Sequence, residues 1–214
     1  MKKLTIALLI TILCSISTIY AESDIQIGLS GPTFEIPKNA SLFNININNH
    51  NFFGEKENVG FSEYVSFSPL TSDLFSRFPG FNLSLFAGPS FKFTADTTDF
   101  ILSTGFKYFF NYTRSYQKFP DNITEESEPA LSVTGTKIFT AYAFSLDFQI
   151  KFFADKRFSF VLGIPASIGM GSENYTEKVT TSNPNSIYMP LTSVGKMEEY
   201  IEIGLPYFMI SLNL

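Results

Sequence analysis

The stretch that decides the fold is RFSFVLGIPASIGM, residues 157 to 170. Its side chains alternate with a period of two, so that one face carries mostly large apolar residues and the other mostly small ones. The first face holds Phe158, Phe160, Leu162, Ile164, Ala166, Ile168 and Met170, and the second holds Ser159, Val161, Gly163, Pro165, Ser167 and Gly169. This is the period of a β-strand, whose successive side chains point to opposite faces of a sheet. Which face meets water decides between a soluble and a membrane protein.

The same alternation recurs along the chain and predicts eight strands, with no convincing run of helical spacing. The apolar ladders of the other seven strands span Ile25 to Leu29, Phe43 to Ile47, Val59 to Phe67, Phe81 to Phe93, Phe100 to Tyr112, Tyr142 to Phe152 and Ile201 to Leu214. The last ladder changes phase near Pro206, which we interpret as a bulge because one extra residue turns the following side chains over. Bulges, or a barrel that is not quite regular, are also expected at Pro89 and Pro165, since a closed barrel has no free edge that could receive a proline.

The two ends of the chain and its composition limit the possible classes. Residues 1–21 have two lysines, a short apolar run and a polar end at Ala21, which predicts a secretory signal peptide and a mature domain of residues 22–214. The single cysteine, Cys14, lies in that leader, so no disulfide is expected. The net charge of −5 argues against a nucleic-acid partner. No cofactor motif is present, and a single histidine cannot supply the usual zinc site, so we expect no cofactor, no metal and no enzyme activity.

The connections between the strands sort by parity. The fourth and sixth strands are followed by tight turns at TADTTD (94–99) and ADKR (154–157), whereas the fifth and seventh are followed by long polar loops, 114–137 and 171–197. In an up-and-down arrangement the tight turns fall at one end and the long loops at the other, as in bacterial outer-membrane barrels. His50 is then expected in a connection on the periplasmic side, without a catalytic role.

The face opposite the ladders carries charges of both signs. An eight-stranded barrel has a lumen that side chains only just fill, so the bulky ladders are expected to face lipid and the polar face to fill the inside. Buried charges need partners, so we expect Lys107 or Lys151 near Asp147 or Glu202. The predicted lumen network is Lys92, Lys107, Asp147, Lys151 and Glu202. We interpret it as a structural plug, with a polar pathway or binding site as the alternative. A soluble periplasmic sandwich or barrel with its ladders buried is a second alternative.

These features together resemble the small eight-stranded outer-membrane barrels of diderm bacteria, the OmpX, OmpA-domain and OmpW-like class. The final strand, PYFMISLNL, is similar to the assembly signal of that class through Phe208, Ile210, Leu212 and Leu214. It departs from the usual pattern because it ends in Leu rather than Phe or Trp. The resemblance implies Sec-dependent export, location in the outer membrane, contact with its lipid and insertion by the barrel-assembly machinery.

Two functions follow as expectations for an all-β, antiparallel up-and-down transmembrane barrel of this kind. The first is a structural or surface-interaction role, exerted on an extracellular ligand or host surface through the loops 114–137 and 171–197. The second is a narrow channel or a binder of small hydrophobic molecules. Tyr108, Tyr112 and Tyr142 lie near predicted strand ends and are expected to form part of an aromatic girdle at the membrane interface.

Overall fold

The computed structural model describes residues 22–30, 33–36, 44–53, 57–68, 80–119, 131–180, 190–204 and 206–213. The predicted signal peptide, residues 1–21, lies outside this part of the chain. The described residues form ten strands: β1 (Glu22–Ser30), β2 (Thr33–Ile36), β3 (Asn44–Phe53), β4 (Val59–Ser68), β5 (Phe81–Ala95), β6 (Thr98–Phe119), β7 (Leu131–Phe152), β8 (Phe158–Thr180), β9 (Thr192–Gly204) and β10 (Tyr207–Asn213). None of these residues belongs to a helix long and apolar enough to cross a membrane.

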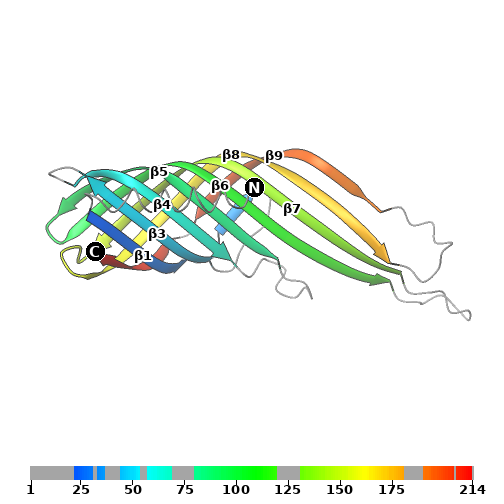
Figure 1. Cartoon of the computed structure of the whole chain (residues 1–214), viewed down its shortest axis with the longest axis horizontal. Coiled ribbons are helices and arrows are strands. Elements are labelled where there is room, and N and C mark those ends of the chain that lie inside the picture. Colours follow the sequence, from blue (N-terminus) through cyan, green and yellow to red (C-terminus); the bar gives the residue numbers. More distant parts are fainter. Residues whose placement is uncertain are drawn as a thin grey trace, which may run out of the picture.

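The strands close into one antiparallel ring (Figure 1). Neighbours in the chain pair with one another from β3 to β9, β1 pairs with β3 and β10, and β10 pairs with β8. β2 pairs with β9 and continues the β1–β10 register, so β1 and β2 together make the first strand of the ring and β9 and β10 the last. The wall of the ring therefore consists of eight strands, which we call staves. This confirms the predicted all-β up-and-down barrel and excludes the two-sheet sandwich.

A bulge lies where β8 changes partner from β10 to β9. Gly163 is opposite Tyr207, and Ala166 is opposite Ile203. Two residues of β8 therefore face three residues of the last stave between these pairs. The extra residue reverses the phase of the last stave, so that Ile203 and Phe208 both point outward although their numbers differ in parity. This is the slip that the sequence predicts.

The three prolines behave in two ways. Pro165 and Pro206 both lie in the bulged stretch, where the ladder to the neighbouring stave is interrupted. Pro89 does not form a bulge, but the ladder is locally irregular there, which is the other outcome expected from the sequence. Its pairing with Phe61 of β4 is part of a continuous register, while the β5–β6 ladder omits Gly88 and Pro89 and resumes without a shift. A proline has no N–H to donate, and here the ladder opens locally and no residue is inserted.

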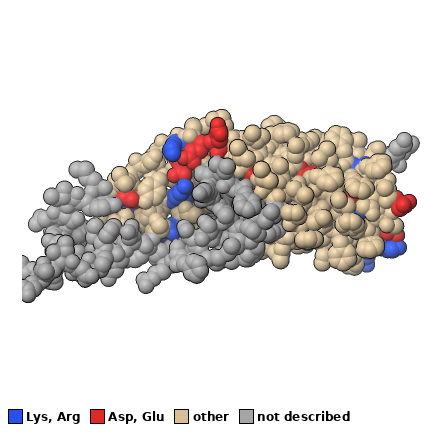
Figure 2. All heavy atoms as spheres, turned by 180° about the vertical axis from the view of Figure 1, so that it is seen from behind, with Lys and Arg blue, Asp and Glu red and all other residues tan. Residues whose placement is uncertain are grey.

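The outside of the ring is apolar and the inside is polar. Large apolar side chains are exposed on the outside of the ring: Phe106 on β6 is 80% exposed and Ile168 on β8 is 62% exposed. The side chains of Ser159 on β8 and Gln149 on β7 point inward and are fully buried. Figure 2 shows one face of the molecule, on which a stretch of surface with few acidic or basic side chains separates a cluster of charges near the middle of the picture from further charges at the right-hand end. The ladders of the stretch 157–170 thus face outward, and the lipocalin-like alternative with buried ladders is excluded.

One wall of the barrel is much taller than the other, and the predicted loops are wrong where the structure describes them. Of the predicted loops 114–137 and 171–197, residues 114–119, 131–137, 171–180 and 192–197 are strand, and the β6–β7 ladder continues from Thr113 opposite Lys137 to Phe119 opposite Leu131. Residues 120–130 and 181–189 of these predicted loops lie outside the described residues. β8 continues in the same way to Thr180. The polar composition of these segments suggested loops. Tyr, Val and Thr, which favour β-strands, alternate with the polar residues, and the strands therefore continue beyond the apolar band. β6 alone has 22 residues, which at a tilt of about 40° rises about 55 Å, roughly twice an apolar band of about 25 Å.

The predicted tight turns are confirmed at the opposite end. Ala95 pairs with Thr98, which leaves a two-residue turn in which Asp96 adopts φ of 54°. The β7–β8 turn covers residues 153–157, with Phe153 at φ of 57°. The β3–β4 connection also lies at this end, so all the short connections share one rim. We call the four-stranded part beyond the opposite rim, residues 113–119, 131–137, 172–180 and 192–199, the extension.

Candidate functional site: the barrel lumen

A buried ion pair occupies the lumen near the rim with the tight turns. The Lys151 Nζ lies 2.8 Å from the Asp24 carboxylate, and both side chains are 3% exposed or less. Lys151 also donates to the Asn213 Oδ1 at 2.6 Å. The carboxylate of Asp24 accepts further hydrogen bonds from Gln26, at 3.0 Å, and from Ser211. These neutral donors and acceptors compensate the cost of removing both charges from water.

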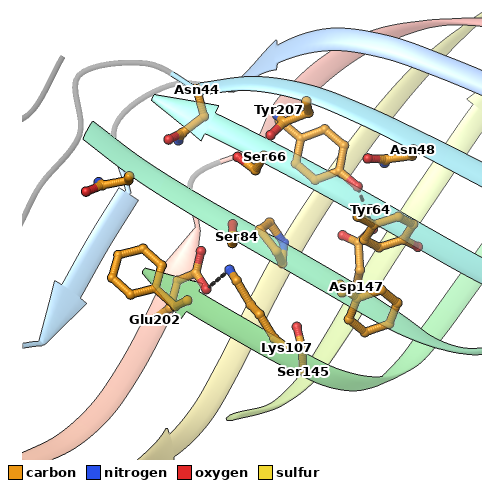
Figure 3. Close-up of a pocket in the computed structure, with 15 residues that line it drawn as sticks. Asn44, Asn48, Tyr64, Ser66, Ser84, Lys107, Ser145, Asp147, Glu202 and Tyr207 are labelled. Atoms are coloured by element: carbon orange, nitrogen blue, oxygen red, sulfur yellow. Dashed lines mark hydrogen bonds and ion pairs between the residues drawn. The ribbon is translucent and has the colours of Figure 1, made fainter. Parts of the chain in front are cut away.

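A second carboxylate, Asp147, lies in the middle of the lumen without a cation in direct contact. The Tyr207 hydroxyl donates to Asp147 Oδ2 at 2.6 Å, and Gln149 Nε2 donates to the same oxygen at 2.7 Å. Gln149 also reaches the Tyr207 oxygen at 2.9 Å, so the three side chains form a closed triangle. Figure 3 shows Tyr207 and Asp147 pointing toward each other across the cavity beside Tyr64.

A third cluster joins β6 to β9 across the lumen. Lys107 and Glu202 form an ion pair whose side chains are 10% and 5% exposed, drawn as a dashed line in Figure 3. Glu202 Oε2 also accepts hydrogen bonds from Ser167 at 3.0 Å and Tyr200 at 3.1 Å. Because the partners lie on staves far apart in the ring, this pair ties the two sides of the barrel together. We call these three clusters the lumen network; its members are Asp24, Lys107, Asp147, Gln149, Lys151, Glu202 and Tyr207.

Aromatic rings fill the lumen toward the extension. Phe109 stacks on Tyr200 with centroids 5.1 Å apart, and Phe139 lies 6.2 Å from both rings. All three side chains are buried. A Cβ atom on Gly171 would lie 2.2 Å from the Phe139 ring, so only glycine leaves space for that ring. This aromatic layer seals the lumen on the side of the extension.

Gly163 shows why the second face of the opening stretch is small. A Cβ atom at this position would lie 2.1 Å from the Tyr207 ring, which crosses over the glycine to reach Asp147. The small residue accommodates a tyrosine from the neighbouring stave.

The five predicted lumen residues lie inside the barrel, but they do not form one connected network. Lys107 and Glu202 meet, as the charge pattern suggests, whereas Lys151 takes Asp24 as its partner. Asp147 is held by hydroxyl and amide donors. Lys92 lies inward on β5 with its ammonium 4.6 Å from the centre of the Phe52 ring. The roles of Asp24 and Tyr207 are not recognised from the sequence, although each alternates with other inward residues: Asp24 with Gln26, and Tyr207 with Met209 and Ser211.

His50 lies in β3 and not in a connection, so its predicted location is wrong. The strand continues to Phe53 because residues 50–53 pair with residues 59–62 of β4. His50 shares one row with Asp24 and Ser62 on adjacent staves, and its Nδ1 lies 2.5 Å from the Ser62 Oγ. All three side chains are at most 2% exposed. Asp24 is engaged by Lys151, so the row does not form a Ser-His-Asp relay, in which the acid orients the histidine.

A small cavity of about 70 Å³ lies in the lumen among Asn48, Tyr64, Lys107, Asp147 and Glu202 (Figure 3). This volume holds a few water molecules. Among the described residues, no group of His, Cys, Asp and Glu side chains is arranged to hold a metal ion.

The extension is polar and carries paired charges. Lys137 and Glu173 lie 2.7 Å apart, and Lys196 and Glu198 are separated by the same distance. The hydrogen bond and charge of Glu198 raise the pKa of Lys196, so this ammonium stays protonated at neutral pH. Figure 2 shows acidic and basic side chains gathered at one place toward this end of the molecule.

The closed ring of eight staves, apolar outside and polar inside, defines the protein as an eight-stranded antiparallel β-barrel of the transmembrane type. Comparison with models of protein families and with the sequences of curated proteins gives no match. Among solved structures, the crystal structure of a major outer membrane protein from Thermus thermophilus is similar to this chain. The two are 10% identical, the alignment covers 91% of this chain and 99% of that chain, and the TM-score is 0.48.

Proposed function

We propose that the protein is a non-conducting outer-membrane barrel that anchors a four-stranded extension at the cell surface. The observation that carries this proposal is the filled lumen: paired charges, a hydrogen-bonded tyrosine and an aromatic layer leave a cavity of only about 70 Å³. A porin of this class needs a continuous aqueous path, which far larger rings provide. The polar face then acts as a plug that holds the staves together.

The proposed location rests on the outer surface of the ring. A band of exposed Phe, Leu and Ile surrounds the barrel, and in water it would be a large apolar patch that drives aggregation. This band is suited to contact the lipid of the outer membrane. Phe208 and Ile210 point outward on β10, and Leu212 lies on the same side of the strand, which suits a final strand read by the assembly machinery; Leu214 lies outside the described residues.

The surface role rests on the extension. Its strands continue the taller wall beyond the apolar band and end far from the rim with the tight turns (Figure 1). Paired charges on this part favour contact with water and with a polar partner. We infer that any extracellular ligand or host surface binds here, on residues 113–119, 131–137, 172–180 and 192–199. The protein is proposed to have no enzyme activity and to require no cofactor.

Single-channel recording in planar lipid bilayers tests the plug. Wild-type protein is expected to insert and to show no conductance steps. Tyr200→Ala combined with Phe139→Ala removes two rings of the aromatic layer and serves as the matched variant, in which any leak is expected to be larger. Regular conductance steps from the wild type would instead support the narrow-channel alternative. Detergent extraction with heat-modifiable gel mobility tests the location, since recovery in the aqueous fraction would exclude it.

A further inference from the structure

One carboxylate interrupts the apolar outer wall. Glu63 lies at the middle of β4, and its neighbours Phe61 and Val65 point outward with it, whereas Ser62 and Tyr64 point inward. Among the described side chains of β1, β3, β4 and β5, it is the only charged one at an outward position. Neither an ion pair nor a hydrogen bond connects it to another described residue. A carboxylate facing lipid at mid-height is costly and marks a functional site.

A hollow in the wall begins at this carboxylate. It has a volume of about 450 Å³ and lies over β4, β5, β6 and the edge of β7. The outward side chains around it are Glu63, Val65, Leu85, Ala87, Phe106, Tyr108 and Tyr142. Ala87 forms the floor of the hollow, because its side chain is far smaller than those of Leu85, the preceding outward residue of β5, and of Phe106, which is opposite Ala87 on β6. The volume lies within the range of small-molecule sites, about 300 to 1,000 Å³.

The arrangement of polar and apolar groups determines which class of ligand this hollow can bind. Glu63 lies at one side, opposite Ala87, and Tyr142 lies three staves away from β4. At a strand spacing of about 4.8 Å the two ends are separated by about 14 Å. The Tyr108 and Tyr142 rings meet at 5.3 Å and form the far wall. One end is therefore anionic, and the outward side chains of the remaining surface are apolar and aromatic. Tyr64, Phe86 and Lys107 also border the hollow, but their side chains point into the lumen.

We propose that this hollow is a binding site for a cationic amphiphile, a molecule with a protonated amine head and a hydrocarbon body. The ammonium pairs with the Glu63 carboxylate, and the hydrocarbon body crosses Ala87 toward Phe106 and Tyr142. The pairing satisfies a charge that otherwise faces lipid alone, and the single negative charge excludes anionic amphiphiles. The site uses the outer wall and does not depend on the lumen or on the extension.

Dodecylammonium is a suitable probe, added to the whole mature protein folded in uncharged maltoside micelles. Methyl groups of alanine labelled with carbon-13 report binding by NMR, with Ala87 in the hollow and Ala166, which is also exposed on the outer wall, as an internal control. Saturable shifts are expected at Ala87 and not at Ala166. Glu63→Gln is expected to weaken the apparent affinity at least tenfold, and the matched variant Glu199→Gln, which alters an exposed carboxylate on β9, is expected to leave it unchanged.

Three results would overturn the proposal. The first is that dodecylammonium binds Glu63→Gln and the wild type with equal apparent affinity. The second is that the Ala166 methyl signal shifts as much as that of Ala87. The third is an unresponsive Ala87 in a protein that light scattering shows to be a dimer, because a second copy would then cover the wall. Glu63→Gln should fold, since it removes a charge from the lipid face. If the variant does not fold, dodecyl sulfate is added to the wild-type protein instead. A shift of the Ala87 signal as large as that caused by dodecylammonium would contradict the proposed selectivity for a cation.

Discussion

Replacing Lys107 by methionine should destabilise the barrel strongly. The Lys107 and Glu202 side chains are 10% and 5% exposed, so the variant leaves a carboxylate in the lumen without its cation. Ser167 and Tyr200 still donate to Glu202, at 3.0 and 3.1 Å, but both are neutral. Removal of one member of a buried ion pair costs about 3–5 kcal/mol. We expect the free energy of unfolding to fall by that amount.

Reversible urea unfolding in lipid vesicles, followed by circular dichroism and gel mobility, measures this loss. The double variant Lys107→Met, Glu202→Gln should recover about 2 kcal/mol of it, because the uncompensated charge is gone. Lys196→Met is the matched control. Lys196 is 67% exposed and paired with Glu198, so its removal should cost less than about 1 kcal/mol. A loss below about 1 kcal/mol for Lys107→Met, or a double variant that is less stable than the single one, would refute the plug.

The same unfolding assay tests three further substitutions. Tyr207→Phe removes the hydroxyl that donates to Asp147 at 2.6 Å and should cost about 1–3 kcal/mol; a neutral effect would mean that the triangle does not stabilise the barrel. Gly163→Ala places a methyl group 2.1 Å from the Tyr207 ring and should cost about 1–3 kcal/mol, and the loss should shrink in combination with Tyr207→Ala. Leu146→Arg puts a charge on the lipid face and should cost about 2–4 kcal/mol; no cost in vesicles would contradict its orientation.

The period of two was sufficient to predict the ring and the direction of its faces. Residues 157–170 alternate between mostly large and mostly small side chains, and a lumen of eight staves has no room for the larger set. The reversal of phase near Pro206 also follows from the sequence, because a bulge is the only way to keep Ile203 and Phe208 on one side. These features depend on local backbone geometry, and the alternation of side chains in the sequence reflects that geometry directly.

The partners inside the lumen could not be predicted in the same way. Lys151 meets Asp24 because the first and last staves of a closed ring are neighbours, and their register relative to β7 depends on the whole circumference. Tyr207 reaches Asp147 only because Gly163 lies below its ring. The extension was missed for a different reason: outside the membrane a strand no longer needs a lipid-facing ladder, so residues 113–119 and 131–137 have the composition of a loop.

Site-directed spin labelling along β7 tests most directly that the ladders meet lipid and the polar face fills the lumen. Residues 22–214 contain no cysteine, so single cysteines can replace residues 144 to 148 in turn in protein of that range reconstituted into vesicles. We expect labels at Phe144, Leu146 and Phe148 to be accessible to oxygen dissolved in lipid and not to a water-soluble nickel reagent. Labels at Ser145 and Asp147 should be inaccessible to both. Nickel accessibility at the odd positions would reveal a water-filled lumen, and oxygen accessibility there would reverse the faces and contradict the account.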